Sequence, residues 1–163
     1  MSSVKQSAIA NLKFVHSMID KLIKDIPEAK ATFQPTPTSN HLIWNLGHLA
    51  LSNAWFRMLL DGGTLDVPGN YDALFGGKSK PASDPKKYPS LADVKKQHDA
   101  QWDRLIAAFE KCSDADMAKP CASDSGGFAN TKGEVADRAA WHEGWHGGQI
   151  SELRRALGLP GVM

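Results

Sequence analysis

The closing stretch TKGEVADRAAWHEGWHGGQISELRRALGLP, residues 131–160, decides the fold, because it has the pattern of one long helix with an inward face. Thr131 can cap its first turn, and Glu134 follows three residues later, as in a capping box. Apolar residues recur at steps of three and four, and the closing GLP supplies stop signals. We therefore predict a helix from about residue 131 to residue 157.

His142 and His146 lie on the apolar track of this helix, at steps of three and four from Ala139 and Ile150. Both should therefore face the protein interior. Residues four apart on a helix have Cβ atoms about 5–6 Å from each other. Two imidazoles in that arrangement can bind one ion at about 2.0–2.1 Å per nitrogen.

Three glycines, Gly144, Gly147 and Gly148, interrupt the same helix. Each mid-helix glycine costs roughly 1 kcal/mol relative to alanine. Their lack of bulk would let a neighbouring helix approach closely, or would leave space for an added ligand at an ion. Tight helix packing without any metal is the alternative interpretation.

Three further segments show helical periodicity, over residues 3–26, 39–60 and 90–112. The first carries one apolar stripe and ends before Pro27. The second is apolar nearly all round, so it should be buried on more than one side. Candidate caps are Thr38, Ser39 or Asn40 for the second helix and Ser90, followed by Asp93, for the third.

The connections between these segments are long. Residues 61–89 are rich in glycine and proline, and a loop of this length is usually functional or a crossover. The run YDALFG within it, residues 71–76, predicts a short helical turn, and residues 113–130 have loop composition. Four helices without an alternating strand pattern predict an all-α four-helix bundle, with one domain over residues 1–163.

The second helix carries a polar line, His41, Asn45, His48 and Ser52, on an otherwise apolar sequence. If that line faces the bundle axis, His48 is the natural third ligand beside the two histidines of the last helix. Neighbouring helices in a bundle lie about 8–10 Å apart, a distance that side chains from both can bridge. Metal sites in bundles are often built in this way.

Other polar residues near these histidines have more than one possible role. Asn45 precedes His48 by three residues and either orients a ligand or serves the structure alone. Gln149 points near the site or bonds the backbone of the second helix. Glu143 is one step off the ligand face, where we expect exposure to solvent or to an interface. No general base can be assigned.

The remaining histidines, tryptophans and cysteines have ordinary structural interpretations. We expect surface or hydrogen-bonded core positions for His16, His41 and His98. We expect core or dimer packing for Trp44, Trp55, Trp102, Trp141 and Trp145. Cys112 and Cys121 are expected to be reduced thiols, because a zinc site would need tighter pairs or more ligands.

Charge and hydropathy exclude several classes of partner. The formal net charge is +1, so no electrostatic footprint for nucleic acid or an anionic membrane exists. The longest apolar zone, residues 42–60, is interrupted by polar residues and is too polar to span a bilayer. Without an apolar run of the signal-peptide type at the N-terminus, we expect a cytoplasmic protein.

Four stretches, NHLIWNLGHLALSNAWF, YDALFG, YPSLADVKKQHDAQWDRL and HEGWHGGQISELRRALGLP, together resemble the DinB-like superfamily over nearly the whole chain. The resemblance implies a four-helix bundle with an up-down-down-up path, often as a homodimer. It also implies a divalent metal held by one histidine of the second helix and two of the last, here His48, His142 and His146. Many relatives carry a further histidine where this chain has Trp145.

Three neutral histidines leave at least one coordination position for water or substrate, as in catalytic rather than structural sites. Bound water could serve a hydrolase, and a bound thiolate could serve a transferase that uses glutathione, bacillithiol or mycothiol. Characterised relatives resemble the thiol transferases. The leading hypothesis is therefore a metal-dependent enzyme that acts on a small molecule.

Two alternatives to an enzyme remain. One is a non-catalytic, stress-linked dimeric module that binds metal, and the other is a bundle whose histidines bond only one another and buried water. Zinc or nickel is the expected ion, and manganese and iron also accept imidazole ligands.

Overall fold

Four long helices carry the chain back and forth in the computed structural model, which describes residues 3–162. They are α1 (Val4–Ile23), α2 (Leu42–Asp61), α4 (Leu91–Lys111) and α6 (Lys132–Ala156). The shorter elements are the helices α3 (Tyr71–Phe75) and α5 (Asp114–Met117) and the 3₁₀ helices η1 (Glu28–Lys30) and η2 (Pro85–Lys87). Within residues 3–162 no strand forms beyond one isolated bridge, so the all-α prediction is confirmed.

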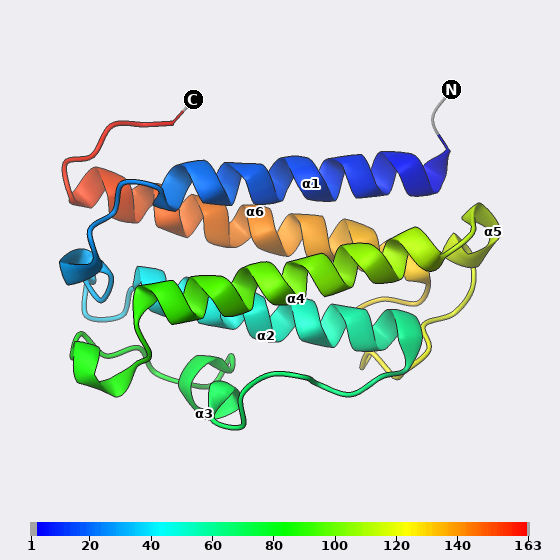
Figure 1. Ribbon diagram of the computed structural model, residues 1–163, viewed down its shortest axis with the longest axis horizontal. Helices are drawn as coiled ribbons and strands as arrows, with labels where there is room; N and C mark the ends of the chain where they lie inside the picture. The colour runs from blue at the N-terminus through cyan, green and yellow to red at the C-terminus, as the bar shows by residue number, and fades with distance from the viewer. Residues whose placement is uncertain (1–2, 163) are drawn as a thin grey trace.

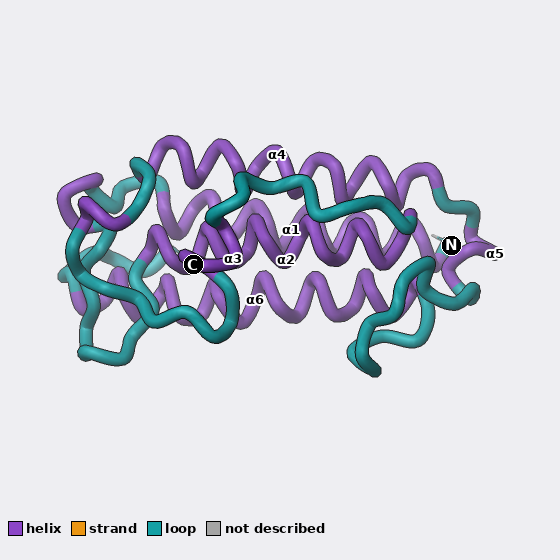
Figure 2. Tube along the Cα trace, turned by 90° about the horizontal axis from the view of Figure 1, so that it is seen from below, coloured by secondary structure: helices purple, strands orange, loops and turns teal. Residues whose placement is uncertain are grey.

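The four long helices form a bundle with an up-down-down-up path (Figure 1). Helices α1 and α6 run in one direction, and α2 and α4 run in the other. Helix α1 packs beside α6, α2 packs beside α4, and α2 also contacts α6. Because α2 and α4 are parallel, the segment between them must return along the bundle, and Figure 2 shows it lying along the outside. This return explains the length of the predicted loop.

The start of α2 differs from the sequence prediction. Its N-cap is His41, whose Nδ1 accepts a hydrogen bond from the Trp44 N–H at 3.1 Å, and not Thr38, Ser39 or Asn40. Ser39 instead lies in a turn of the preceding loop, where its hydroxyl accepts a backbone N–H. An imidazole acceptor can replace the usual hydroxyl or carboxylate at this position because the ring is buried against the helix end.

The caps predicted for α4 and α6 are confirmed. The hydroxyl of Ser90 accepts the Asp93 N–H at 3.1 Å, and that of Thr131 accepts the Glu134 N–H at 3.2 Å. The capping box at α6 is not closed on Thr131, however. The Glu134 carboxylate reaches one residue further back, to the N–H of Asn130 at 2.8 Å.

Two other boundaries differ from the predictions. Helix α1 ends at Ile23, and the three residues up to Ile26 form a turn with an Ile26 N–H to Ile23 C=O bond of 3.2 Å. Helix α5 lies inside the predicted loop 113–130. Ser113 and Asp116 form a reciprocal capping box around it, which stabilises a single turn that composition alone does not reveal.

The core consists of two apolar clusters, one toward each end of the bundle. The first includes Leu22, Leu46, Phe75, Val94 and Ile150, and the second includes Leu12, Phe56, Leu105, Phe109 and Val135. Between the clusters lies a polar layer to which each long helix contributes one side chain. We define this polar layer as His16, Asn53, His98 and Glu143.

Two further features of the described chain bear on the predictions. Both Cys112 and Cys121 are free thiols that pack against the second cluster, in agreement with the expected reduced state. In the described part of the chain, no helix combines the length and the apolar character that crossing a membrane would need.

Candidate metal centre

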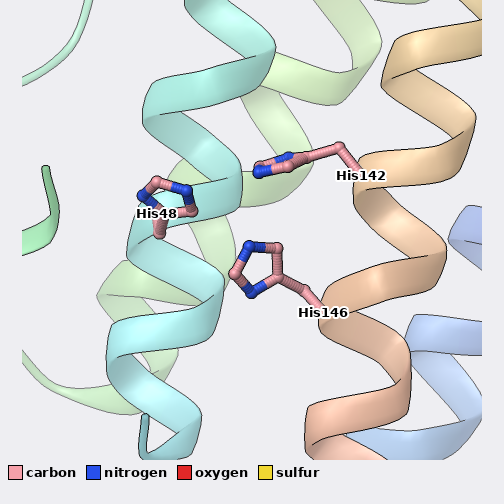
Figure 3. Close-up of side chains that lie close together, drawn as sticks. All are labelled: His48, His142 and His146. Carbon is pink, nitrogen blue, oxygen red and sulfur yellow. The ribbon is translucent and has the colours of Figure 1, made fainter. Parts of the chain in front are cut away.

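The side chains of His48, His142 and His146 point toward one another from two helices (Figure 3). His48 comes from α2, and the other two come from successive turns of α6. One possible ligand atom from each residue lies within 4.8 Å of the others. The ring centroids are 5.1 Å apart for His48 and His142, 4.9 Å for His48 and His146, and 4.6 Å for His142 and His146.

The ring of His48 is held in place from two sides. It stacks on Trp44, one helical turn earlier, with ring centroids 4.7 Å apart and planes 9° from parallel. Its Nδ1–H donates to the backbone carbonyl of Phe75 at 2.7 Å, which leaves Nε2 without a proton. A carbonyl at the other ring nitrogen is a common way to orient a metal-binding histidine.

The Phe75 carbonyl reaches His48 because α3 packs closely on α2 at Gly47. A Cβ atom at Gly47 would lie 2.5 Å from the Phe75 ring, so no larger residue fits without a shift. The Trp44 indole N–H adds a second tie, since it donates to the Ser79 hydroxyl at 2.8 Å. The return segment after α2 therefore fixes one side of the candidate site.

The ring of His146 is oriented by Asn45, one turn before His48 on α2. The Nδ1–H of His146 donates to the Asn45 side-chain oxygen at 2.7 Å. The Asn45 amide nitrogen donates to the backbone carbonyls of Asn40 and His41, at 3.2 and 3.0 Å, which fixes the orientation of the amide. Asn45 thus bonds both a candidate ligand and the backbone before α2, so the two roles that the sequence left as alternatives are compatible.

Burial keeps the three imidazoles neutral. It lowers the pKa of His48, and together with the neighbouring histidines it lowers the pKa of His142 to about 4 and that of His146 to about 2. Neutral imidazole is the form that binds metal ions. The Nδ1 of His142 is buried and has no hydrogen-bond partner among the described residues.

The sequence matches the DinB superfamily over residues 11–150, which is most of the 163-residue chain. The chain belongs to the DinB superfamily. The search of curated proteins found no match.

In this member of the DinB superfamily, Glu143 is fully buried, so the predicted exposure to solvent or to an interface is wrong. One residue along a helix turns the side chain by about 100°, and that turn points Glu143 away from the three histidines, toward Asn53 of α2 and His98 of α4. There its Oε1 accepts the Asn53 side-chain N–H at 3.0 Å and lies 3.1 Å from His98 Nε2. Helix α6 is covered by neighbours on more than one side.

Electrostatics couple Glu143 to His98. Burial raises the pKa of the Glu143 carboxyl, but the charge and hydrogen bond of His98 outweigh burial and hold that pKa below its usual range. Burial likewise lowers the pKa of His98, but Glu143 and Asp99 outweigh it and raise the pKa to about 9. The Glu143 carboxylate therefore interacts with His98 and Asn53 and not with the three histidines of the candidate centre.

The other residues singled out in the sequence take varied places. The Gln149 side-chain oxygen accepts from the Asn40 side chain at 2.9 Å, so it bonds the segment before α2 and not the α2 backbone. Among the tryptophans, Trp44 and Trp102 are buried in the core, and Trp141 and Trp145 are 51% and 58% exposed, so dimer packing stays a prediction for these two. Their rings lie 5.1 Å apart on α6, next to His142 and His146.

Gly144, Gly147 and Gly148 of α6 face α1 rather than the three histidines. A Cβ at Gly147 would lie 3.2 Å from Ile19, so Gly147 serves the close approach of the two helices. A Cβ at Gly144 would meet only Val15, at 4.0 Å, and one at Gly148 would meet nothing within 4 Å. The structure therefore favours helix packing as the interpretation for Gly147 alone.

Proposed function

We propose that this chain is a divalent-metal-dependent enzyme acting on a small molecule, with His48, His142 and His146 as the metal ligands. The observation that carries the proposal is the convergence of three neutral imidazoles, two of which have their Nδ1–H bonded elsewhere. Three protein ligands are typical of catalytic ions, which keep a position for water or substrate and can hold a thiol as its reactive thiolate. Zinc or nickel fits this nitrogen donor set, and manganese or iron also accepts imidazole.

Thiol transfer is favoured over hydrolysis by the composition of the centre. The three converging side chains are all histidines, and the buried carboxylate next in sequence, Glu143, is bonded to His98 and Asn53. Hydrolysis usually relies on a carboxylate or histidine general base near the attacking water. A thiol that loses its proton on binding an ion has less need of such a base. The proposed cosubstrate is therefore a low-molecular-weight thiol.

The proposal is tested on protein purified without an affinity tag. Metal content is measured by elemental analysis for the wild type and for His48→Ala. Turnover is then measured with each bound metal against a panel of thiols and electrophiles, with ester and amide substrates as the hydrolase arm. We expect bound metal and thiol-dependent turnover in the wild type and loss of both in His48→Ala. Metal binding with negligible turnover throughout would instead support a non-catalytic module.

We also propose a homodimer, on the basis of the resemblance and of apolar surface on α6. Trp141 and Trp145 place two large aromatic rings in solvent on the helix that carries two of the proposed ligands. Large exposed aromatic pairs are typical of interaction surfaces. A dimer formed there would cover one flank of the proposed centre.

A further inference from the structure

The polar layer between the two apolar clusters is unusual because three of its four side chains, Asn53, His98 and Glu143, are fully buried, and the fourth, His16, is half-buried. His98 and Glu143 are both 0% exposed, and each comes from a different helix, α4 and α6. His16 on α1 and Asn53 on α2 complete the layer. Buried ionisable side chains are rare in a core unless they are paired, hydrogen-bonded or bound to a metal.

The Glu143 carboxylate is held in one orientation, but only one of its two oxygens has hydrogen-bond partners in the described chain. Its Oε1 accepts the Asn53 N–H at 3.0 Å and lies 3.1 Å from His98 Nε2. Its Oε2 is buried and has no hydrogen-bond partner within residues 3–162. An ionised carboxylate has room for about four hydrogen bonds or a metal ion, so the second oxygen is available to a further ligand.

His16 approaches the same carboxylate from α1. Its ring stacks on Trp102, with centroids 4.4 Å apart and planes 3° from parallel, and it lies 5.0 Å from the ring of His98. The Nδ1 of His16 is also buried without a partner in the described chain. An ion pair between His98 and Glu143 would not need this third side chain, so a pair alone does not account for the arrangement.

The far side of His98 carries a second carboxylate. Its Nδ1 lies 3.7 Å from the Asp99 Oδ1, which is just beyond hydrogen-bonding distance. Both of these atoms are buried and lack other partners among residues 3–162. A carboxylate at the outer nitrogen is the usual support of a histidine that binds metal through its inner nitrogen. The position of Asp99 fits this supporting role for His98, whose Nε2 faces Glu143.

The three inner donors lie close enough together to share one ion after small movements. One possible ligand atom from each of His16, His98 and Glu143 lies within 4.8 Å of the others, the same limit that the three histidines of the first centre satisfy. Ligands about 2.0–2.2 Å from a shared ion lie about 3.4 Å apart in a tetrahedral site. Closing the cluster therefore needs movements of about an ångström or less per donor, within reach of side-chain adjustment.

We propose that His16, His98 and Glu143 form a second divalent transition-metal site, separate from the His48 centre, that joins α1, α4 and α6. Two imidazoles and one carboxylate are an established donor set for zinc and for ferrous iron. In binding, the ion displaces the proton from His98 Nε2, and that proton is released to solvent. Because the Glu143 side chain is fully buried, the role assigned to this ion is to stabilise the bundle.

The test counts ions per chain. Untagged protein is stripped with a chelator and titrated with Co²⁺, whose absorption spectrum reports its ligands, and the bound ion is measured by elemental analysis. We expect two ions per chain in the wild type, one in His48→Ala, one in His16→Gln and none in the double variant. His41→Asn is the matched control, because it replaces a buried histidine outside both clusters and keeps an N-cap residue. It should keep two ions.

The remaining outcomes separate the two proposals. One ion that survives His16→Gln but not His48→Ala would overturn the second site and leave the proposed function standing. One ion that survives His48→Ala but not His16→Gln would overturn the proposed function and leave the second site standing. Glu143→Gln is a second probe that keeps the shape of the side chain, and circular dichroism confirms that each variant folds. No ion in the wild type would overturn both sites.

A stability measurement checks the assigned role. Adding Zn²⁺ to metal-free His48→Ala, at about 100 times the dissociation constant, should raise the melting temperature by roughly 5–10 °C. The same addition to the double variant His48→Ala/His16→Gln should leave the melting temperature unchanged. Equal shifts in the two proteins would show that the stabilising ion binds elsewhere.

Discussion

The Nδ1 of His146 lies 2.7 Å from the side-chain oxygen of Asn45, a residue one turn before His48 on the neighbouring helix. This hydrogen bond joins α6 to α2 at the level of the candidate centre. It also fixes the tautomer of His146, because the protonated Nδ1 leaves Nε2 as the only nitrogen with a free lone pair. The position of one proposed ligand thus depends on a residue of the helix that carries another.

Replacing Asn45 should therefore weaken metal binding without removing a ligand. In Asn45→Ala the His146 ring loses its acceptor, and we expect metal affinity to fall by roughly 10–100-fold. Asn45→Asp keeps an acceptor oxygen, so its affinity should be at least that of the wild type. Competition with a coloured chelator measures both. Equal losses in the two variants would contradict the orienting role.

Gly47 should matter for both stability and metal binding. In Gly47→Ala the new Cβ would lie 2.5 Å from the Phe75 ring, so α3 must shift and take the Phe75 carbonyl away from His48. We expect a loss of about 1–3 kcal/mol in the free energy of unfolding, by overpacking, and weaker metal binding. Urea denaturation and chelator competition give the two quantities.

Gly148→Ala is the matched control for that variant. A Cβ at this position would have no neighbour within 4 Å, and Gly148 is helical and exposed. Alanine should therefore raise the free energy of unfolding by roughly 0.5–1 kcal/mol through helix propensity. If alanine lowers the free energy of unfolding at both positions, α2 and α6 tolerate added bulk poorly in general. The specific contact with Phe75 would then not explain the loss at Gly47.

Apolar periodicity predicted the four long helices and placed His142 and His146 on an inward face, whereas His48 was singled out by the polar line on the second helix. The burial of Glu143 was missed because that reasoning assigns a helix one inner face and one outer face. Helix α6 contacts both α1 and α2, so a side chain turned off the ligand face meets another helix before it meets solvent. The sequence signal for this burial was the pair His16 and His98, which lie on the first and third long helices.

Contacts made by irregular segments could not be predicted from the sequence either. The YDALFG turn was predicted, but the bond from His48 to the Phe75 carbonyl depends on how that turn docks on α2. A backbone carbonyl has no residue signature, and the only indication was the glycine in WNLGHL. The His41 cap was missed for a similar reason, since histidine rarely caps a helix and does so here because its ring is buried.

Stability of the metal-free protein should decrease in acid, with a contribution from His41. Burial lowers the pKa of His41 from 6.5 to about 4, so the folded state keeps this ring neutral while the unfolded state takes up a proton. The stabilising effect is present above pH 6.5 and is lost as pH falls toward 4, with a slope of at most about 1.4 kcal/mol per pH unit. Urea denaturation between pH 4 and pH 7 should show this decline.

The variant His41→Asn isolates that contribution. Asparagine keeps a side-chain acceptor for the Trp44 N–H but does not titrate. Its unfolding free energy should depend less steeply on pH than that of the wild type, with the remaining slope supplied by other buried histidines. An unchanged slope would mean that His41 is not kept neutral by folding.

Trp145 should affect self-association and leave folding nearly unchanged. The side chain is 58% exposed and stands beside Trp141, so Trp145→Ser should change the free energy of unfolding by less than about 0.5 kcal/mol. If α6 forms the proposed dimer surface, the same change should raise the dimer dissociation constant at least tenfold, as loss of a central aromatic residue commonly does. Val4→Ser, at a 70% exposed position on α1, is the control and should leave association unchanged. Sedimentation equilibrium at micromolar concentration measures all three proteins, and a wild type that sediments as a monomer would contradict the proposed dimer.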